Sequence, residues 1–238
     1  MAVAGLDVPP LGPGESLVAA ARVADLAQDG AFAFALPPPD EARIARFVHG
    51  PDRAARRTAW RLARLLAGAV LRQPPALLEI RRDARGRPHL AGGHGLDLNL
   101  SHGGGWVAVG LARGGRIGVD VEGPRPPALW QDLARFFLGG LEHAAWSALP
   151  PHAQPAAALS LWCRKEAVLK ATGEGLAGDA RTVRLPPGDG IHHRQGLALH
   201  VAALDLPAAA PYAPGALPAC LAFAVEGTRP PLLLLPGG

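Results

Sequence analysis

Apolar residues recur at helical spacing along residues 40–73, where they are interspersed with many arginines. A Gly-Pro pair at residues 50–51 interrupts this pattern, because proline is tolerated in the first turn of a helix and not in its interior. We therefore expect two helices here, the second over about residues 52–72. Helical spacing returns over residues 127–148 and, after a proline-containing loop, over residues 156–172.

Strict alternation marks the predicted strands. In LDLNLS, residues 96–101, each leucine is followed by a polar residue, which is typical of a half-buried strand. Apolar runs at residues 76–80, 106–112 and 116–122 favour further strands, and the Gly-Gly of RGGR predicts a hairpin turn between the last two. Short strands separated by proline and glycine are expected over residues 181–238.

Helices followed by strands occur twice along the chain. This order predicts an α+β fold, a pseudo-dimer of two similar α+β halves packed together. We place the division in the RGGR segment, so that the halves comprise residues 1–113 and 114–238.

Composition narrows the class of protein. The 238 residues are 49% hydrophobic, which is enough for a substantial core. No apolar run approaches the roughly 18 residues needed to cross a bilayer, and no basic segment precedes one at the N-terminus, so we expect a cytoplasmic protein. The two cysteines, Cys163 and Cys220, lack the spacing of a disulfide framework or a zinc site.

Charge points to acidic partners. The net charge is +4, which favours nucleic acid, phosphorylated small molecules or an acidic protein. Of the 24 basic residues 22 are arginine, and both lysines, Lys165 and Lys170, lie in WCRKEAVLKATG. A compact ammonium differs from a guanidinium in size and proton affinity, so this clustering hints at a role that arginine cannot fill.

Two carboxylates share one face of the strand at residues 116–122. Asp120 and Glu122 are two residues apart, so they point to the same side. They are either a solvated strand face or a site for a hard cation such as Mg²⁺. Trp162, Glu166 and Lys170 follow each other at helical spacing, either as an ordinary Glu–Lys pair or as a third carboxylate and a phosphate contact.

Three other motifs carry less weight. HGGG at residues 102–105 resembles an esterase oxyanion hole, but no G-x-S-x-G nucleophile motif accompanies it. GEGLAG at residues 173–178 matches the glycine pattern of dinucleotide-binding loops, yet it follows a helix, so a helix stop is expected. The histidine pair at residues 192–193 has no partner at ligand spacing.

Taken in order, five motifs resemble a known family. They are GRP at 86–88, NLSH at 99–102, GVDVE at 118–122, FFLGGLEH at 136–143 and WCRKEAVLKATGEGL at 162–176. This series resembles the 4'-phosphopantetheinyl transferases of the Sfp type. The resemblance implies a pseudo-dimer that binds coenzyme A between its halves. It further implies transfer of the phosphopantetheine arm to a serine of an apo acyl or peptidyl carrier protein, with release of 3',5'-ADP.

The resemblance also implies roles for individual residues. Asp120, Glu122 and Glu166 would hold Mg²⁺. Lys170 would stabilise and protonate the departing phosphate, and Glu142 and Glu166 are alternative general bases. Positions that match coenzyme A contacts of the family are Arg43, Arg57, Arg87, Ser101 and His102, while Lys165 would either contact phosphate as well or be a solvated neighbour. The first half would then hold the nucleotide, and the second the metal, the catalytic helix and the carrier.

Other functions remain open at this point. A metal-dependent phosphohydrolase or nucleotidyl transferase could use the same three carboxylates. A carrier-binding scaffold without activity would not need the intact acids and Lys170. A nucleic-acid-binding module is disfavoured because aromatic residues make up only 5% of the chain and no nucleic-acid motif occurs. We expect a monomer that binds neither nucleic acid nor membrane.

Overall fold

The computed structural model describes residues 8–123, 125–207 and 217–235. Its first half combines a four-stranded sheet, a two-stranded hairpin and flanking helices. The elements in chain order are β1 (Ser16–Arg22), α1 (Val23–Leu26), η1 (Gly30–Phe32), α2 (Pro38–Ile44), α3 (Gly50–Leu71), η2 (Pro75–Leu77), β2 (Ile80–Arg82), β3 (Pro88–Leu90), β4 (Leu96–Gly103) and β5 (Trp106–Arg113).

The second half repeats this plan with a second four-stranded sheet. Its elements are β6 (Ile117–Glu122), α4 (Pro127–Phe137), α5 (Gly140–Ser147), α6 (Gln154–Thr172), η3 (Gly175–Ala177), η4 (Ala180–Thr182), β7 (Gly190–Arg194), β8 (Leu197–Asp205) and β9 (Cys220–Glu226), followed by β10 (Leu232–Leu234).

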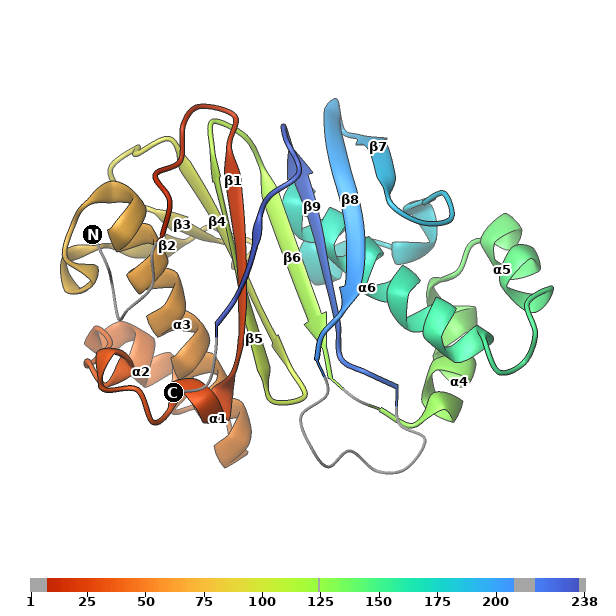
Figure 1. Ribbon diagram of the computed structural model, residues 1–238, viewed down its shortest axis with the longest axis horizontal. Helices are drawn as coiled ribbons and strands as arrows, with labels where there is room; N and C mark the ends of the chain where they lie inside the picture. The colour runs from red at the N-terminus through yellow and green to blue at the C-terminus, as the bar shows by residue number, and fades with distance from the viewer. Residues whose placement is uncertain (1–7, 124, 208–216, 236–238) are drawn as a thin grey trace.

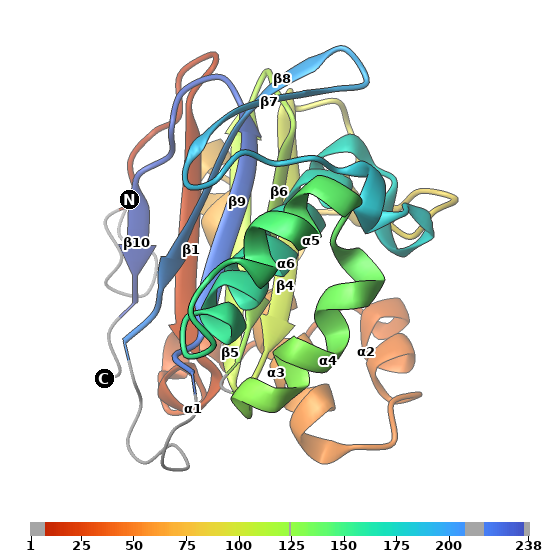
Figure 2. The same cartoon turned by 90° about the vertical axis from the view of Figure 1, so that its right-hand side faces the viewer.

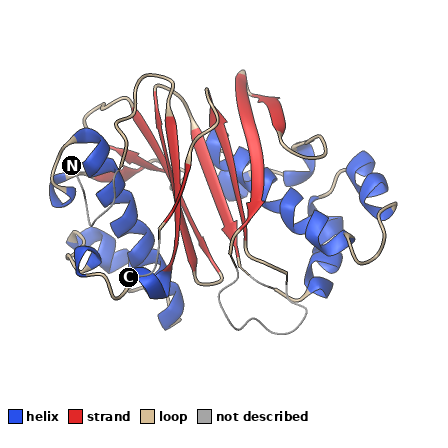
Figure 3. Ribbon diagram, in the orientation of Figure 1, coloured by secondary structure: helices blue, strands red, loops and turns tan. Residues whose placement is uncertain are grey.

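The two sheets face each other, and helices cover their outer faces (Figures 1 and 3). The first sheet has the order β10-β1-β5-β4, the second β6-β9-β8-β7. α3 packs on β4 and β5, while α6 packs on β6, β8 and β9 (Figure 2). One hydrophobic core lies under each helical layer, and a third, with Val18, Val119 and Phe223, joins the two sheets. The predicted α+β fold of two similar halves is therefore confirmed.

The helices follow from their sequence patterns. α3 begins at Gly50 with Pro51 in its first turn and buries Leu62 and Leu66 against the sheet. It ends at Arg72, whose φ of 55° is left-handed. α6 ends at Gly173, also left-handed, so the glycine pattern that follows it is a helix stop as expected.

β5 and β6 do not form the predicted hairpin. β6 pairs with β9, so the Gly-Gly segment carries the chain from one sheet to the other. Side chains of β4 satisfy the free edge of β6: the amides of Ile117, Val119 and Val121 donate to Asp97, Asn99 and Ser101. The polar positions of LDLNLS are thus acceptors for a neighbouring backbone.

Two element boundaries and one strand pairing also differ from the expected ones. In the predicted strand at 76–80, the first two residues belong to the 3-10 helix η2, which begins at Pro75, and pairing starts only at Ile80. The helical pattern over 127–148 divides into α4 and α5. β10 pairs in parallel with β1, so the end of the chain returns to the first sheet across the proposed division at residue 113.

A single glycine brings α6 close to β6. A Cβ added to Gly118 would lie 2.0 Å from the carbonyl oxygen of Ala167. The helix backbone therefore rests directly on the strand, which brings Glu166 and Lys170 near Asp120. Among the described helices, none combines the length and the apolar character needed to cross a membrane.

Candidate functional site

A cavity of about 430 Å³ lies at the seam between the halves. α3 and the β2–β3 hairpin line it on one side, β6 and α6 on the other, and β4 lies between them. The charged and polar lining residues are Arg56, Arg82, Arg85, Arg87, Asn99, Ser101, His102, Asp120, Glu122, Glu166 and Lys170. Cations thus come mainly from the first half and carboxylates from the second.

The acidic side is organised around Asp120. Its Oδ1 lies 2.6 Å from Nζ of Lys170 and accepts a 3.0 Å hydrogen bond from Oγ of Ser101. The indole of Trp162 donates to Oε1 of Glu122 over 3.3 Å. Helix α6 therefore presents Trp162 and Lys170 to the strand at the spacing expected from the sequence.

Burial and mutual repulsion disturb the carboxylates. Loss of solvent, followed by the charge of Asp120, raises the pKa of Glu166 to about 7. The same two causes raise the pKa of Glu122, although Arg125 and the Trp162 hydrogen bond oppose the change. Oδ2 of Asp120 is buried, and no described group bonds to it. Buried acids that repel each other are stabilised by a cation between them.

The donor set fits a hard cation that also binds substrate. Among the described residues, no three His, Cys, Asp or Glu side chains form a metal-binding group by themselves. Mg²⁺, however, typically takes one or two protein carboxylates and fills its shell with water and phosphate oxygens. Asp120, with its unpaired Oδ2, lies in the same cavity as Glu122 and Glu166, so the cavity offers the carboxylates that such an ion would need.

The basic side contains arginines fixed over aromatic rings. The guanidinium of Arg82 lies 4.8 Å from the ring centre of Trp60, and that of Arg56 lies 3.5 Å from Phe47. Burial, reinforced by the charges of Arg56 and Lys170, lowers the pKa of His102 to about 4. His102 is therefore neutral at pH 7 and can donate one hydrogen bond without adding charge.

Two arginines that were predicted to contact coenzyme A, Arg43 and Arg57, lie outside the seam cavity. Arg57 forms a two-pronged pair with Glu41, with nitrogen–oxygen distances of 2.9 and 2.8 Å. Arg43 lines a separate cavity beside α2 and η2. Neither lines the seam cavity, so their predicted contacts with coenzyme A are not supported by this arrangement. Arg56, one residue before Arg57 on α3, lines the seam cavity instead.

Three arginines that line the cavity, Arg56, Arg82 and Arg85, were not among the candidates from the sequence. Arg56 and Trp60 are four residues apart on α3, so helical spacing alone places them on one face. Arg82 and Arg85 belong to the β2–β3 hairpin, whose position over the seam is a tertiary feature. No local signal in the sequence separates these two from the other arginines.

Glu142 and Lys165 form a buried pair away from the seam. Nζ of Lys165 lies 2.6 Å from Oε2 of Glu142 and also donates to the carbonyls of Phe137 and Ala180. Oε1 of Glu142 accepts from the amide of Leu185. Neither residue lines the seam cavity. The pair ties α4, α5 and η4 to α6, and this placement does not favour their predicted roles as base and phosphate contact.

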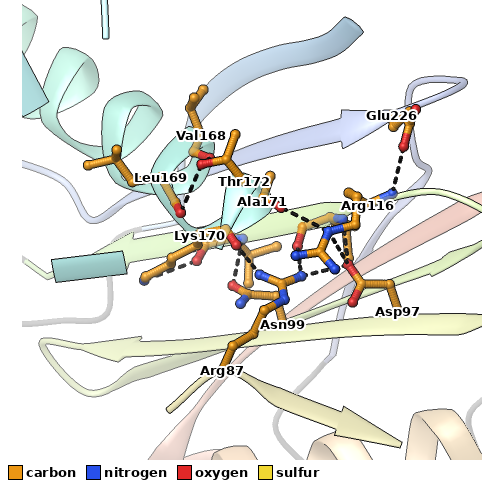
Figure 4. Close-up of polar contacts among 12 residues, drawn as sticks. Arg87, Asp97, Asn99, Arg116, Val168, Leu169, Lys170, Ala171, Thr172 and Glu226 are labelled. Carbon is orange, nitrogen blue, oxygen red and sulfur yellow. Dashed lines mark hydrogen bonds and ion pairs between the residues drawn. The ribbon is translucent and has the colours of Figure 1, made fainter. Parts of the chain in front are cut away.

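Ser101, His102 and Arg87 line the seam cavity, and their contacts with coenzyme A stay predictions. Ser101 links Lys170 to Asp120, because its Oγ accepts from Nζ over 3.1 Å and donates to Oδ1. Arg87 instead turns its guanidinium inward, toward β6 and the end of α6 (Figure 4).

Comparison with known proteins agrees with this architecture. A family model described as the 4'-phosphopantetheinyl transferase superfamily matches residues 116–204. A second, described as 4'-phosphopantetheinyl transferase, N-terminal, matches residues 27–112. The match over residues 27–112 spans α2 to β5 of the first half, and the match over residues 116–204 spans β6 to most of β8 in the second.

Individual relatives carry the same description. The chain is 36% identical over 133 residues to 4'-phosphopantetheinyl transferase AcpT of Salmonella typhi, covering 56% of this chain and 66% of the relative. It is 32% identical over 142 residues to HetI of Nostoc sp. (58% and 60%). It is 28% identical over 135 residues to the 4'-phosphopantetheinyl transferase of Bacillus subtilis (57% and 59%). The chain thus matches just under two thirds, or less, of each relative's length. Two consecutive family matches and these relatives show that the chain belongs to the 4'-phosphopantetheinyl transferase superfamily.

Proposed function

We propose that the chain transfers the 4'-phosphopantetheine arm of coenzyme A to a serine of an apo acyl or peptidyl carrier protein, with Mg²⁺ and with release of 3',5'-ADP. The observation that carries this proposal is the seam cavity, where arginines of one half face three carboxylates and Lys170 of the other. Such a distribution suits a substrate with several phosphates at one end and a reacting pyrophosphate at the other. Membership of the family supports the same reaction.

The transfer requires a proton acceptor and a charged leaving group. The serine oxygen forms a bond to the β-phosphorus of the pyrophosphate, and the bond from that phosphorus to the bridging oxygen breaks. The bridging oxygen leaves with the electron pair as part of 3',5'-ADP. Catalysis of this kind depends mainly on positioning and on stabilising phosphate charge.

Glu166 and Lys170 are the proposed proton carriers. Glu166 lies in the seam cavity close to Asp120 and Lys170, where its carboxylate can accept the serine proton. Lys170 places an ammonium group beside Asp120, where it can stabilise and protonate the departing phosphate. Arginine would hold its proton too tightly for that second task.

Asp120, Glu122 and Glu166 would hold the Mg²⁺ ion. The unpaired Oδ2 of Asp120 and the raised pKa values of both glutamates support this assignment. A bound Mg²⁺ would neutralise charge on the pyrophosphate oxygens during transfer.

The phosphates of the nucleotide would be held by the first half. Arg56, Arg82 and Arg85 line the cavity on that side, together with Ser101 and neutral His102. Stacking on Phe47 and Trp60 restricts two of these arginines, so less side-chain entropy is lost when a phosphate binds.

The carrier is proposed to dock on the second half. Phe136 and Leu141 are 62% and 83% exposed at the ends of α4 and α5, which gives this half an apolar contact surface. The net positive charge of the chain suits an acidic partner. A monomer in the cytoplasm remains our expectation.

Release of 3',5'-ADP tests the proposal. The chain is incubated with coenzyme A and Mg²⁺, with an apo carrier, without one, or with a carrier whose acceptor serine is replaced by alanine. Chromatography then measures free 3',5'-ADP. We expect release only with the intact carrier. Equal release in all three mixtures would instead favour the metal-dependent phosphohydrolase.

A further inference from the structure

Arg87 bridges three elements at the seam. It lies directly before β3 and is only 9% exposed. Its Nη2 donates to Oδ2 of Asp97 over 2.6 Å and to the carbonyl of Ile117 over 2.8 Å, and its Nη1 donates to the carbonyl of Lys170 (Figure 4). One guanidinium therefore joins β4, β6 and the last turn of α6.

These contacts leave little of Arg87 for a phosphate. Asp97 compensates its charge, and both terminal nitrogens already donate to groups of the fold. Its Nε is buried and has no partner among the described residues. Arg56, in contrast, faces the same cavity without a described ion pair, so its charge is available to a ligand.

The same contacts fix the end of α6. The last carbonyls of a helix lack partners within it, and cations are favourable there. Arg87 donates to the carbonyl of Lys170, while Nε of Arg116 donates to that of Ala171 over 3.1 Å. Asp97 lies between the two arginines, with its Oδ2 4.0 Å from Nε of Arg116. The helix end is thus held by one arginine from each half of the chain, and Asp97 of the first half lies between them.

Fixing this turn also fixes the side chain of Lys170. Its main-chain carbonyl is held by Arg87 and its Nζ by Asp120, Ser101 and the carbonyl of Val119. Movement of the last turn of α6 would draw Nζ away from Asp120. We infer that Arg87, together with Asp97, is a positioning residue that holds Lys170 in place, and that it is not a phosphate ligand.

The first test observes Lys170 directly and needs no activity. The chain has only two lysines, so ¹⁵N-lysine labelling gives two side-chain ammonium signals in an NMR spectrum. Lys165 lies in its separate buried pair and serves as an internal reference. We expect Arg87→Gln and Asp97→Asn to shift or broaden the Lys170 signal while the Lys165 signal stays unchanged.

Arg56→Gln is the matched control for this experiment, because it removes a cavity arginine that does not touch α6. It should leave the Lys170 contacts intact. If Arg87→Gln does not fold, Arg87→Lys and Asp97→Asn carry the test. An unchanged Lys170 signal in the folded variants would overturn the inference.

The second test separates binding from turnover, and it rests on the proposed function. Calorimetry gives the Kd for coenzyme A, and a transfer assay gives kcat. Arg87→Gln and Asp97→Asn should lower kcat by about 10²-fold, the cost of a misplaced catalytic group, and change the Kd by less than about threefold. Arg56→Gln should raise the Kd about tenfold, as expected for a lost charge-assisted bond.

The opposite pattern would overturn the inference. A tenfold higher Kd for Arg87→Gln, with kcat at saturation unchanged and Asp97→Asn without effect, would make Arg87 a phosphate ligand. If the unaltered chain has no transfer activity, the proposed function fails. The NMR result for Lys170 would still decide whether Arg87 positions it.

Discussion

At the scale of single residues, the site depends on one cation placed among acids. Lys170 contacts Asp120 and Ser101, and Glu166 lies in the same cavity with a pKa near 7. In the proposed reaction, Glu166 accepts a proton and Lys170 donates one, and a side chain with different proton affinity would not replace either of them. The sequence hinted at the role of Lys170, because both lysines of an arginine-rich chain lie in one short segment.

Replacement of Lys170 by arginine tests the need for an ammonium group. Lys170→Arg keeps the charge, but a guanidinium is too large for the contacts with Asp120 and Ser101 and does not release its proton. We expect kcat for transfer to fall about 10²- to 10⁴-fold, the contribution of a general acid. Steady-state kinetics measure this, with the exposed Arg46→Lys as control. A kcat within about threefold of the unaltered chain would remove the proton-donor role.

The sequence revealed some of the site residues and could not reveal others. Asp120 and Glu122 share a face because strands alternate, and Trp162, Glu166 and Lys170 share one because helices repeat. Local geometry thus predicts which side chains point the same way. It does not predict what lies opposite them, and the buried pair of Glu142 and Lys165, two candidates named from the resemblance, is such a tertiary contact.

At the scale of elements, α6 connects the chemistry to the fold. It packs in the core of the second half from Ala158 to Ala171, and its last turn contacts both halves. The periodicity of the sequence predicted a helix over residues 156–172, close to the observed bounds of α6. The partner of β6 was not predictable in this way, because strand pairing is decided between segments about a hundred residues apart. A Gly-Gly sequence permits a hairpin but does not require one.

Gly118 is the point at which β6 and α6 touch. An added methyl group would meet the Ala167 carbonyl at 2.0 Å, so Gly118→Ala must push the helix away from the strand. We expect the free energy of unfolding to fall by about 1–3 kcal/mol, as for other overpacked sites. Urea unfolding measures the change. Gly140→Ala is the matched control, because no atom lies within 4 Å of its added Cβ. Equal stability of both variants would contradict close packing at Gly118.

A salt bridge ties the end of α6 to β7. Glu174 accepts two 2.7 Å hydrogen bonds from Arg194, and these bonds lower the pKa of Glu174. A carboxyl group whose pKa is lower in the folded state stabilises the fold above its unfolded pKa. That stability is lost as the pH falls through the folded pKa.

Glu174→Gln tests this contribution. At pH 7 we expect the variant to be about 1 kcal/mol less stable than the unaltered chain, since a charge-assisted bond is lost from a mostly shielded pair. The difference should shrink as the pH is lowered below the folded pKa, because Glu174 itself is then neutral. Denaturant unfolding at several pH values measures both. A difference that does not depend on pH would contradict the assignment.

At the scale of the whole molecule, the two halves contribute opposite charges to one cavity. The first half provides arginines and the second carboxylates, while Arg87 and the β4 side chains connect them. The sequence predicted two α+β halves but not that β10 would return to the first sheet. That pairing joins the end of the chain to its beginning and depends on the complete fold.

Binding across the seam should stabilise both halves together. Coenzyme A with Mg²⁺, at about 100 times its Kd, should raise the free energy of unfolding by about 2.7 kcal/mol and so raise the Tm. At the same ligand concentration, Arg82→Gln in the first half and Asp120→Asn in the second should each reduce the shift, which scanning calorimetry measures. Reduction by only one of the two would indicate that the ligand contacts a single half.

The mass of an apo carrier protein tests the central claim most directly. The carrier is incubated with the chain, coenzyme A and Mg²⁺, and its intact mass is measured beside reactions with Glu166→Gln and without metal. We predict a gain equal to one phosphopantetheine on the acceptor serine, lost or strongly reduced in both controls. A carrier that stays unmodified while the folded chain binds coenzyme A, or one modified equally by Glu166→Gln, would contradict the account.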